Sequence, residues 1–240
     1  MNGSPRKHPG KGFTLTEILV VILIIGVLAL VSNSVYVKMR QKANSAVAVQ
    51  SLRQLGSLVL GLAQEDGKMP NEGDYPNPED DPPADTSWDG YVLAYMGASD
   101  VIASTPPQVP QSYESIFFHP NDYPDPIETA NYPTAKRTFV YLRVLSDVSI
   151  AAIDDPSRTG MLGEHPWRTD GRNRVGFKSA SFMDMSALVP DPLTGDDLNP
   201  DGKFNFVFAD GHIETLTREE SAGSGSTSKP LGLWTLDPAD

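Results

Sequence analysis

The chain of 240 residues contains no cysteine, and this absence excludes disulfide bonds, thiolate metal sites and cysteine nucleophiles. Basic residues are also scarce, since 19 Lys and Arg stand against 31 Asp and Glu and the net charge is -12. A surface of that sign does not attract phosphate backbones. The composition therefore predicts that the protein has no nucleic-acid partner.

The sequence also lacks the common signatures of catalysis. It has no H-E-x-x-H motif, no G-x-S-x-G motif and no glycine-rich phosphate-binding loop. A match to S-x-x-K at 226–229 falls in the low-complexity stretch SAGSGSTSKP, where coincidence is the better explanation. His119, His165 and His212 show no metal-ligand spacing, although Glu164 adjoins one of them. We therefore expect a protein that is not an enzyme.

No proline occurs between Phe13 and Met69, so a single long helix can run through this part of the chain. Within it, Ile18 to Val31 is an apolar stretch of fourteen residues. As a helix it spans roughly 21 Å, against a hydrocarbon core of roughly 30 Å. With its flanks, 13–37 is long enough to cross a membrane if hydroxyl side chains bond to helix carbonyls. Length alone leaves both a cleaved signal and a membrane span open.

Charge and cleavage signals do not decide between these two interpretations. Three basic residues precede the apolar stretch and three follow it: Arg6, Lys7 and Lys11, then Lys38, Arg40 and Lys42. An ordinary export signal needs small residues around a cleavage site beyond the apolar stretch, and Ser32-Asn33-Ser34 matches this poorly. An ordinary signal also has no use for Glu17, the acid at the mouth of the stretch.

The residues KGFTLTE at 11–17, followed by the apolar stretch, resemble the class III signal of type IV pilins and type II secretion pseudopilins. The resemblance implies that a prepilin peptidase cuts after Gly12, removes the basic leader 1–12 and methylates the new amino terminus at Phe13. It also implies that Glu17, the fifth residue after the cut, pairs with the amino terminus of a neighbouring subunit. An α-ammonium near a membrane interface is stabilised by an anionic partner, and methylation keeps its charge.

After the apolar stretch the pattern becomes amphipathic. Apolar residues recur at spacings of three and four, at Ala48, Leu52, Leu55, Val59 and Leu62. This predicts that one helix continues to about Gln64. Some fifty residues of helix are about 75 Å long, far longer than a bilayer is thick, so the second half must pack on a soluble domain.

The rest of the chain predicts a loop-rich domain with short strands, since the sequence holds 20 Gly and 21 Pro. The expected strands are 115–118, 138–145, 174–177 and 204–208, with a hairpin that turns at Asp210-Gly211 and returns along 212–216. We expect an α+β, pilin-like fold made of a transmembrane half-helix (13–37), its amphipathic continuation (38–65) and a globular domain (66–240) with a small antiparallel sheet. Residues 66–88 are expected to form a surface loop, and 231–236 to dock back on the domain through Trp234.

Four further landmarks are FFHPND at 117–122, TFVY at 138–141, MLGE at 161–164 and NFVFADGH at 205–212. In this order they are similar to the prepilin-like proteins with a C-terminal H-x9-DG motif that are abundant in planctomycetes and verrucomicrobia. The histidine of that motif is replaced here by Pro200, ten residues before Asp210. The resemblance therefore assigns no role to that first histidine in this chain.

Residues 197–208 follow part of the spacing of an EF-type calcium loop. Oxygen ligands fall at its first, third, fifth and ninth positions, at Asp197, Asn199, Asp201 and Asn205, with Gly202 at the sixth. Phe208 stands at the twelfth position, which excludes a complete EF-hand. Two interpretations stay open: an incomplete calcium site finished by Asp191, Asp196 or a carbonyl, and an ordinary exposed turn.

Taken together, these features indicate a structural subunit of a type II secretion pseudopilus or a type IV pilus-like filament. The expected partners are the prepilin peptidase, other pilin or pseudopilin subunits and an inner-membrane assembly platform. No cofactor is required, with calcium as the one hypothesis. The expected location is the inner membrane, crossed once, with the C-terminal domain in the periplasm or on the cell surface. The alternative is a membrane-tethered calcium- or glycan-binding module or a minor adhesive subunit.

Overall fold

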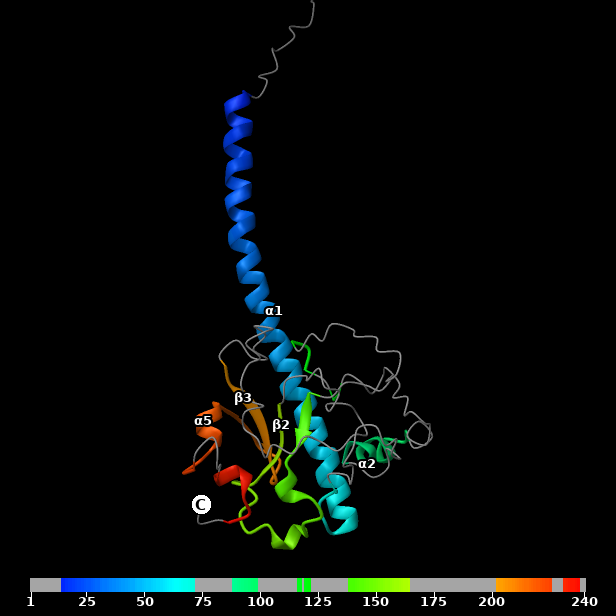
Figure 1. Ribbon diagram of the computed structural model, residues 1–240. Helices are drawn as coiled ribbons and strands as arrows, with labels where there is room; N and C mark the ends of the chain where they lie inside the picture. Colours follow the sequence, from blue (N-terminus) through cyan, green and yellow to red (C-terminus); the bar gives the residue numbers. More distant parts are fainter. Residues whose placement is uncertain are drawn as a thin grey trace, which may run out of the picture. The chain divides into compact units, whose positions relative to one another are not determined.

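The computed structural model describes residues 14–71, 88–98, 116–117, 119–121, 138–164, 202–225 and 231–237. The chain divides into two units, residues 1–40 and 41–240. Helix α1 (Leu15–Asp66) runs without a break through 52 residues (Figure 1). The prediction of one helix to about Gln64 is confirmed, because nothing in this stretch removes a helical hydrogen bond.

In the first unit, α1 exposes its apolar side chains. Those from Ile18 to Leu30 are about half exposed or more. By length and composition, this helix is able to cross a membrane. An exposed, uncharged helical surface of this kind is consistent with a single membrane anchor.

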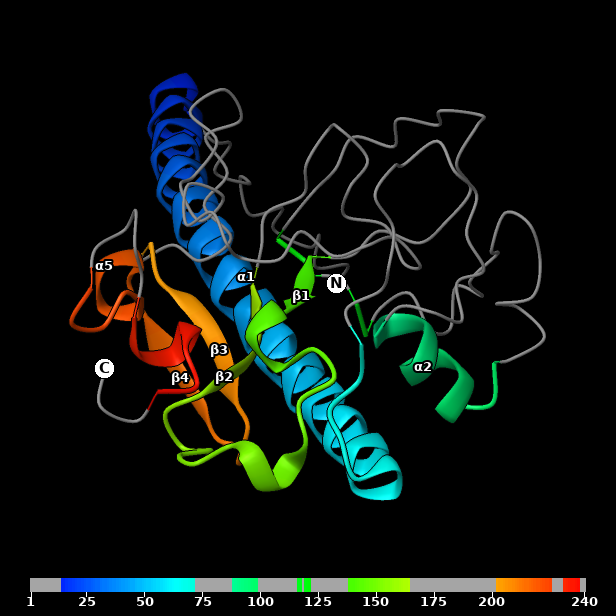
Figure 2. The same cartoon turned by 60° about the horizontal axis from the view of Figure 1, so that its bottom comes forward.

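The second unit is built around one antiparallel sheet with the strand order β1-β2-β3-β4 (Figure 2). The strands are β1 (Phe139–Tyr141), β2 (Gly160–Glu164), β3 (Phe204–Phe208) and β4 (Ile213–Leu216). Phe139 pairs with Glu164, and Phe206 pairs with Gly163 on one side and Glu214 on the other. A small antiparallel sheet behind a long helix is the α+β arrangement of pilins, as predicted.

One face of the sheet packs against α1. Five helix residues at spacings of three and four are completely buried: Ala48, Leu52, Leu55, Val59 and Ala63. The predicted stripe is therefore the core face, apart from Leu62, which is partly buried. The approach is close at Gly56, where an added Cβ would lie 2.8 Å from Cγ1 of Val207 in β3. Glycine at this position lets the helix backbone lie directly on the sheet.

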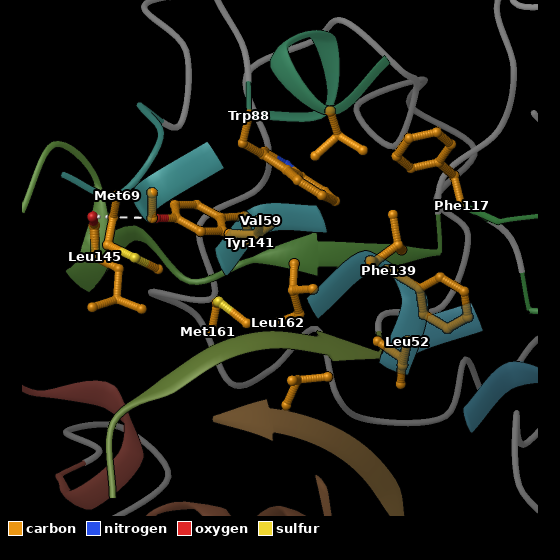
Figure 3. Close-up of a cluster of buried hydrophobic side chains, with 14 of the residues drawn as sticks. Leu52, Val59, Met69, Trp88, Phe117, Phe139, Tyr141, Leu145, Met161 and Leu162 are labelled. Atoms are coloured by element: carbon orange, nitrogen blue, oxygen red, sulfur yellow. Dashed lines mark hydrogen bonds between the residues drawn. The ribbon is translucent and has the colours of Figure 1, made fainter. Parts of the chain in front are cut away.

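Large aromatic side chains complete this core beside the helix (Figure 3). Trp88 stacks on Tyr141 with ring centroids 5.8 Å apart and meets Phe117 edge-on at 6.1 Å. The Tyr141 hydroxyl donates to the Leu145 carbonyl at 3.2 Å, so its polar end is satisfied inside the core. Trp88 begins helix α2 (Trp88–Tyr95).

The opposite face of the sheet is covered by the C-terminal segment. Its core holds Val140, Leu142, Phe204, Phe206, Phe208, Ala222 and Leu233. Helix α5 (Arg218–Ser221) and the 3-10 turn η5 (Gly232–Trp234) supply the cover. Trp234 meets Phe206 edge-on at 6.1 Å and its indole N–H donates to the Ser221 carbonyl at 2.7 Å. The prediction that this segment docks through Trp234 is confirmed.

Several predicted elements differ from the observed ones. Ile116 and Phe117 lie in a turn and not in a strand, although both are buried. The expected strand 138–145 is shorter, because after Tyr141 the chain enters the 3-10 turns η2 (Arg143–Leu145) and η3 (Ile150–Ala152). Asp147 adopts a left-handed conformation between them (φ 58). The predicted strand 174–177 lies outside the described residues.

Two elements were not predicted as such. Strand β2 has the sequence GMLGE, with two glycines and no β-branched residue, so its composition does not signal a strand. Helix α2 begins at the end of the segment expected to be a loop. At the start of that segment, Lys68 forms an isolated bridge with Ser149. Tertiary contacts therefore decide the structure in both places.

Candidate assembly site and buried polar network

The amino end of α1 is closed by a capping box between Thr14 and Glu17. The Thr14 backbone N–H donates to Oε2 of Glu17 at 2.8 Å, and the Glu17 N–H donates to Oγ1 of Thr14 at 3.3 Å. The Thr14 hydroxyl also donates to Oε2, at 2.9 Å. These reciprocal bonds satisfy backbone donors that the first turn of a helix leaves open, and they turn the carboxylate toward the amino end.

This arrangement leaves Glu17 able to meet a cation. Both residues of the box are exposed. In the described part of the chain, Oε1 of Glu17 accepts no hydrogen bond, while Oε2 is used by Thr14. A carboxylate at a helix amino terminus is also favoured by the helix dipole. The predicted processing residues, Gly12 and Phe13, lie outside the described residues, immediately before this box.

A second polar site lies inside the second unit (41–240), which we call the globular unit. Each of the four sequence landmarks, 117–122, 138–141, 161–164 and 205–212, contributes a residue to it. Nε2 of His119 lies 3.6 Å from Oε1 of Glu164, and both side chains are completely buried. The Glu164 carboxylate accepts the backbone N–H and the side-chain N–H of Asn205, both at 2.8 Å. The His119 backbone N–H donates to Oγ1 of Thr138. These residues form what we call the buried polar network.

Asn205 holds the centre of this network from strand β3. Its Oδ1 accepts the Thr215 hydroxyl at 2.7 Å, so donors and acceptors alternate from β4 through β3 to β2. Two donors from one asparagine compensate the cost of burying the Glu164 carboxylate. The network therefore ties three neighbouring strands together at one end of the sheet.

Asn121 connects the network to helix α1. Its backbone N–H donates to Nδ1 of His119 at 3.0 Å. Its side-chain N–H donates to the Gln41 carbonyl at 3.0 Å, and its Oδ1 accepts from Nδ2 of Asn44 at 2.8 Å. The Ser45 hydroxyl donates to the same Gln41 carbonyl at 3.0 Å. The segment 119–121 is thus held by side-chain hydrogen bonds on two sides.

The Asp210-Gly211 turn joins β3 to β4, as predicted. Gly211 has φ 89, a conformation that favours glycine, and its N–H donates to the Phe208 carbonyl at 2.9 Å. Oδ1 of Asp210 accepts the His212 backbone N–H at 3.0 Å and lies 2.5 Å from Nδ1 of the same histidine. Partial burial raises the pKa of Asp210, but the hydrogen bonds and charge of His212 outweigh it and hold the pKa below its ordinary value. In the structure this motif forms the turn of the β3–β4 hairpin.

The calcium prediction falls mostly outside the described residues. Asp197, Asn199 and Asp201 lie outside them, and Asn205 lies in β3 with its side chain bonded to Glu164 and Thr215. Within the described ranges, no group of three His, Asp or Glu side chains could hold a metal ion. Calcium binding at 197–205 therefore stays a prediction.

The sequence does not predict the buried polar network, although its members lie in the four landmark motifs. Glu164 adjoins His165 in the sequence, whereas the structure pairs it with His119. One signal was present: Asn205 interrupts the aromatic strand FNFVF, and Glu164 ends the apolar stretch MLG. Polar residues inside buried strands require partners.

In a comparison with known families, the model of the prokaryotic N-terminal methylation motif matches residues 9–32. No curated protein and no solved structure matches the chain. The matched range includes Gly12, Phe13, Glu17 and the whole apolar stretch, so the chain carries a prepilin-type N-terminal signal.

Proposed function

We propose that this chain, which carries a prepilin-type methylation signal, is a structural subunit of a type II secretion pseudopilus or a type IV pilus-like filament. The observation that carries the proposal is the methylation motif at 9–32 placed directly on an unbroken helix of 52 residues. In this function the protein performs no reaction itself. It is cleaved after Gly12, methylated at Phe13 and then packed by its helix against other subunits.

The capping box supports a specific role for Glu17 in assembly. Cleavage after Gly12 creates an α-ammonium at Phe13, and in an apolar helix bundle this charge needs an anion. Glu17 presents a carboxylate at the same end of the helix, with Oε1 not engaged by Thr14. Pairing with the amino terminus of a neighbouring subunit fixes the axial position of one helix on the next.

The globular unit supports a role as the part of the subunit outside the membrane. Its core forms around the second half of α1, so the exposed apolar first half is left for lipid and for neighbouring helices. The partners proposed are the prepilin peptidase, other subunits and the inner-membrane assembly platform. The proposed location is the inner membrane, with the globular unit in the periplasm or, after assembly, on the cell surface.

The first test is the mass of the mature protein and the behaviour of Glu17→Gln. We expect the mature protein to begin at methylated Phe13. Glutamine at this position can still form the capping box, so the substitution removes the charge and keeps the helix start. We expect Glu17→Gln to be processed normally but to enter filaments at least about tenfold less, which corresponds to losing one buried charge pair. Incorporation is measured by cross-linking and sedimentation of sheared filaments.

The matched control is Glu65→Gln, which removes an exposed carboxylate at the other end of the same helix. We expect it to assemble like the wild type. Unchanged assembly of Glu17→Gln would refute the charge pair and favour a membrane-tethered binding module. A mature protein that retains residues 1–12 would refute processing itself.

A further inference from the structure

We propose that His119 is a pH-dependent latch: its neutral ring holds segment 119–121 against helix α1, and protonation at Nδ1 releases that segment. The latch lies wholly within the globular unit. It does not depend on filament formation, so it is tested separately from the proposed function.

The hydrogen bonds define the protonation state of the ring in the closed latch. Nδ1 of His119 receives the Asn121 backbone N–H at 3.0 Å. A backbone N–H only donates, so Nδ1 must present a lone pair. The single ring proton of the neutral imidazole is therefore on Nε2, the nitrogen that faces Oε1 of Glu164 at 3.6 Å.

The residue held by this lone pair is the one that contacts the helix. Asn121 donates to the Gln41 carbonyl at 3.0 Å and to Oγ of Ser45 at 3.4 Å, and it accepts from Asn44 at 2.8 Å. Its backbone position is set by His119 and its side chain by the helix. The ring of His119 and residues 41–45 of α1 are therefore linked through one asparagine.

Protonation at Nδ1 makes this bond impossible, because a ring N–H would then face the Asn121 N–H. Two donors at hydrogen-bond distance repel, and the ring is completely buried. Among the residues that the structure describes, Glu164 of β2 is the ionisable group that faces the ring, and its carboxylate balances the positive charge of the imidazolium. The other described groups of this site are uncharged: Thr138 and Phe139, Asn205 of β3, and Gln41, Asn44 and Ser45 of α1. Acid therefore acts on the link to Asn121, while the ring keeps a counter-ion on its other side.

The consequence is a local opening at mildly acid pH, the range in which a free histidine side chain, with a pKa of about 6.5, becomes charged. Segment 119–121 detaches from α1 while the apolar core of the unit stays closed. The face of α1 at residues 41–45 then becomes accessible to solvent or to another chain. Acidification would thus alter one defined part of the subunit surface.

The experiment uses the full chain in detergent micelles. Carbon and nitrogen NMR of labelled histidine should show the Nε2–H neutral form for His119 at about pH 7.5. Hydrogen exchange, corrected for the intrinsic effect of pH, should rise about tenfold or more at 117–121 on going to about pH 5, because the Asn121 backbone N–H loses its buried acceptor. Peptides from strand β3 should stay protected.

Two variants make the test specific. His119→Asn keeps a side-chain oxygen that can accept from Asn121 and does not titrate, so the acid-induced exchange should disappear. His212→Asn removes the exposed histidine of the β3–β4 turn and should leave the acid response unchanged. The same response in His119→Asn as in the wild type would overturn the proposal. If that variant does not fold, the wild type alone still tests the proposal. Either of two results would overturn it: NMR that places the proton of neutral His119 on Nδ1, or hydrogen exchange at 117–121 that does not rise as the ring titrates.

Discussion

At the scale of single residues, buried polar groups of this protein join separate segments of the chain. The buried Glu164 and Asn205 and the exposed Thr215 belong to three neighbouring strands and share one chain of hydrogen bonds. Since a buried carboxylate is costly without donors, the bonds from Asn205 both stabilise Glu164 and fix the strands in register. The carboxylate of Asp210, nearer the surface, likewise has polar partners: the backbone N–H and the ring of His212.

Asp210 gives a pH prediction at this scale. His212 holds the pKa of Asp210 in the folded protein below its ordinary value. The contribution of this carboxylate to folding stability is therefore fully present above the pKa of the unfolded chain, about 3.9, and is lost as the pH falls through the folded pKa. The side chain is 38% exposed, so the contribution is about 0.2–1 kcal/mol. We expect Asp210→Asn to be less stable than the wild type near neutral pH and equally stable in strong acid. Denaturant unfolding across pH measures the difference; a pH-independent difference would contradict this cause.

At the scale of elements, the C-terminal segment depends on glycines that allow close backbone contact. An added Cβ at Gly160 would lie 2.8 Å from Cδ2 of Leu142 and 2.9 Å from Cδ1 of Leu233. Gly223 and Gly232, both at positive φ, lie against one another in the same region. The absence of these side chains lets the segment 231–234 lie on the sheet and close the second core.

We therefore expect Gly160→Ala to destabilise the globular unit by about 1–3 kcal/mol, because the new methyl group overpacks this contact. Thermal unfolding followed by tryptophan fluorescence measures the change, since Trp234 lies at the affected site. In a Leu233→Ala background the same glycine substitution should cost less than in the wild type, because the shortened side chain leaves room for the new methyl group. The control is Gly26→Ala, whose Cβ meets no atom within 4 Å. Equal stability of Gly160→Ala and the wild type would show that the segment does not depend on this contact.

At the scale of the whole molecule, the two units have opposite surface requirements. Residues 1–40 expose apolar side chains that need lipid or other helices, and residues 41–240 fold around their own two cores. The acidic segment 197–205 belongs to the second unit, and whether it binds an ion bears on the stability of that unit.

If calcium binds there, it must stabilise the folded protein, by about 2.7 kcal/mol at a hundredfold excess over its dissociation constant. We expect calcium to raise the melting temperature of the wild type and to leave Asp201→Ala unchanged. Magnesium, which demands a tighter octahedral set of ligands, should raise the melting temperature less than calcium does. An equal melting temperature of the wild type with calcium and with chelator would remove this prediction.

The sequence by itself determined the parts of this protein that depend on local chemistry. The missing prolines and the apolar stretch predicted the long helix, the KGFTLTE residues predicted the processing signal, and Asp210-Gly211 predicted the hairpin turn. Periodicity also predicted which face of α1 is buried, from Ala48 to Val59. Each of these follows from residues close together in the chain, so a pattern along the sequence is enough to reveal it.

Only the tertiary structure decided the features that join distant residues. Strand β2 exists because its neighbours supply hydrogen bonds that its own composition does not favour. His119 meets Glu164 across 45 positions, and Asn121 meets Gln41 across 80, with no periodic signal to announce either pair. The physical reason is that a buried polar group gains its partner from packing, and packing brings together residues that the order of the chain keeps apart.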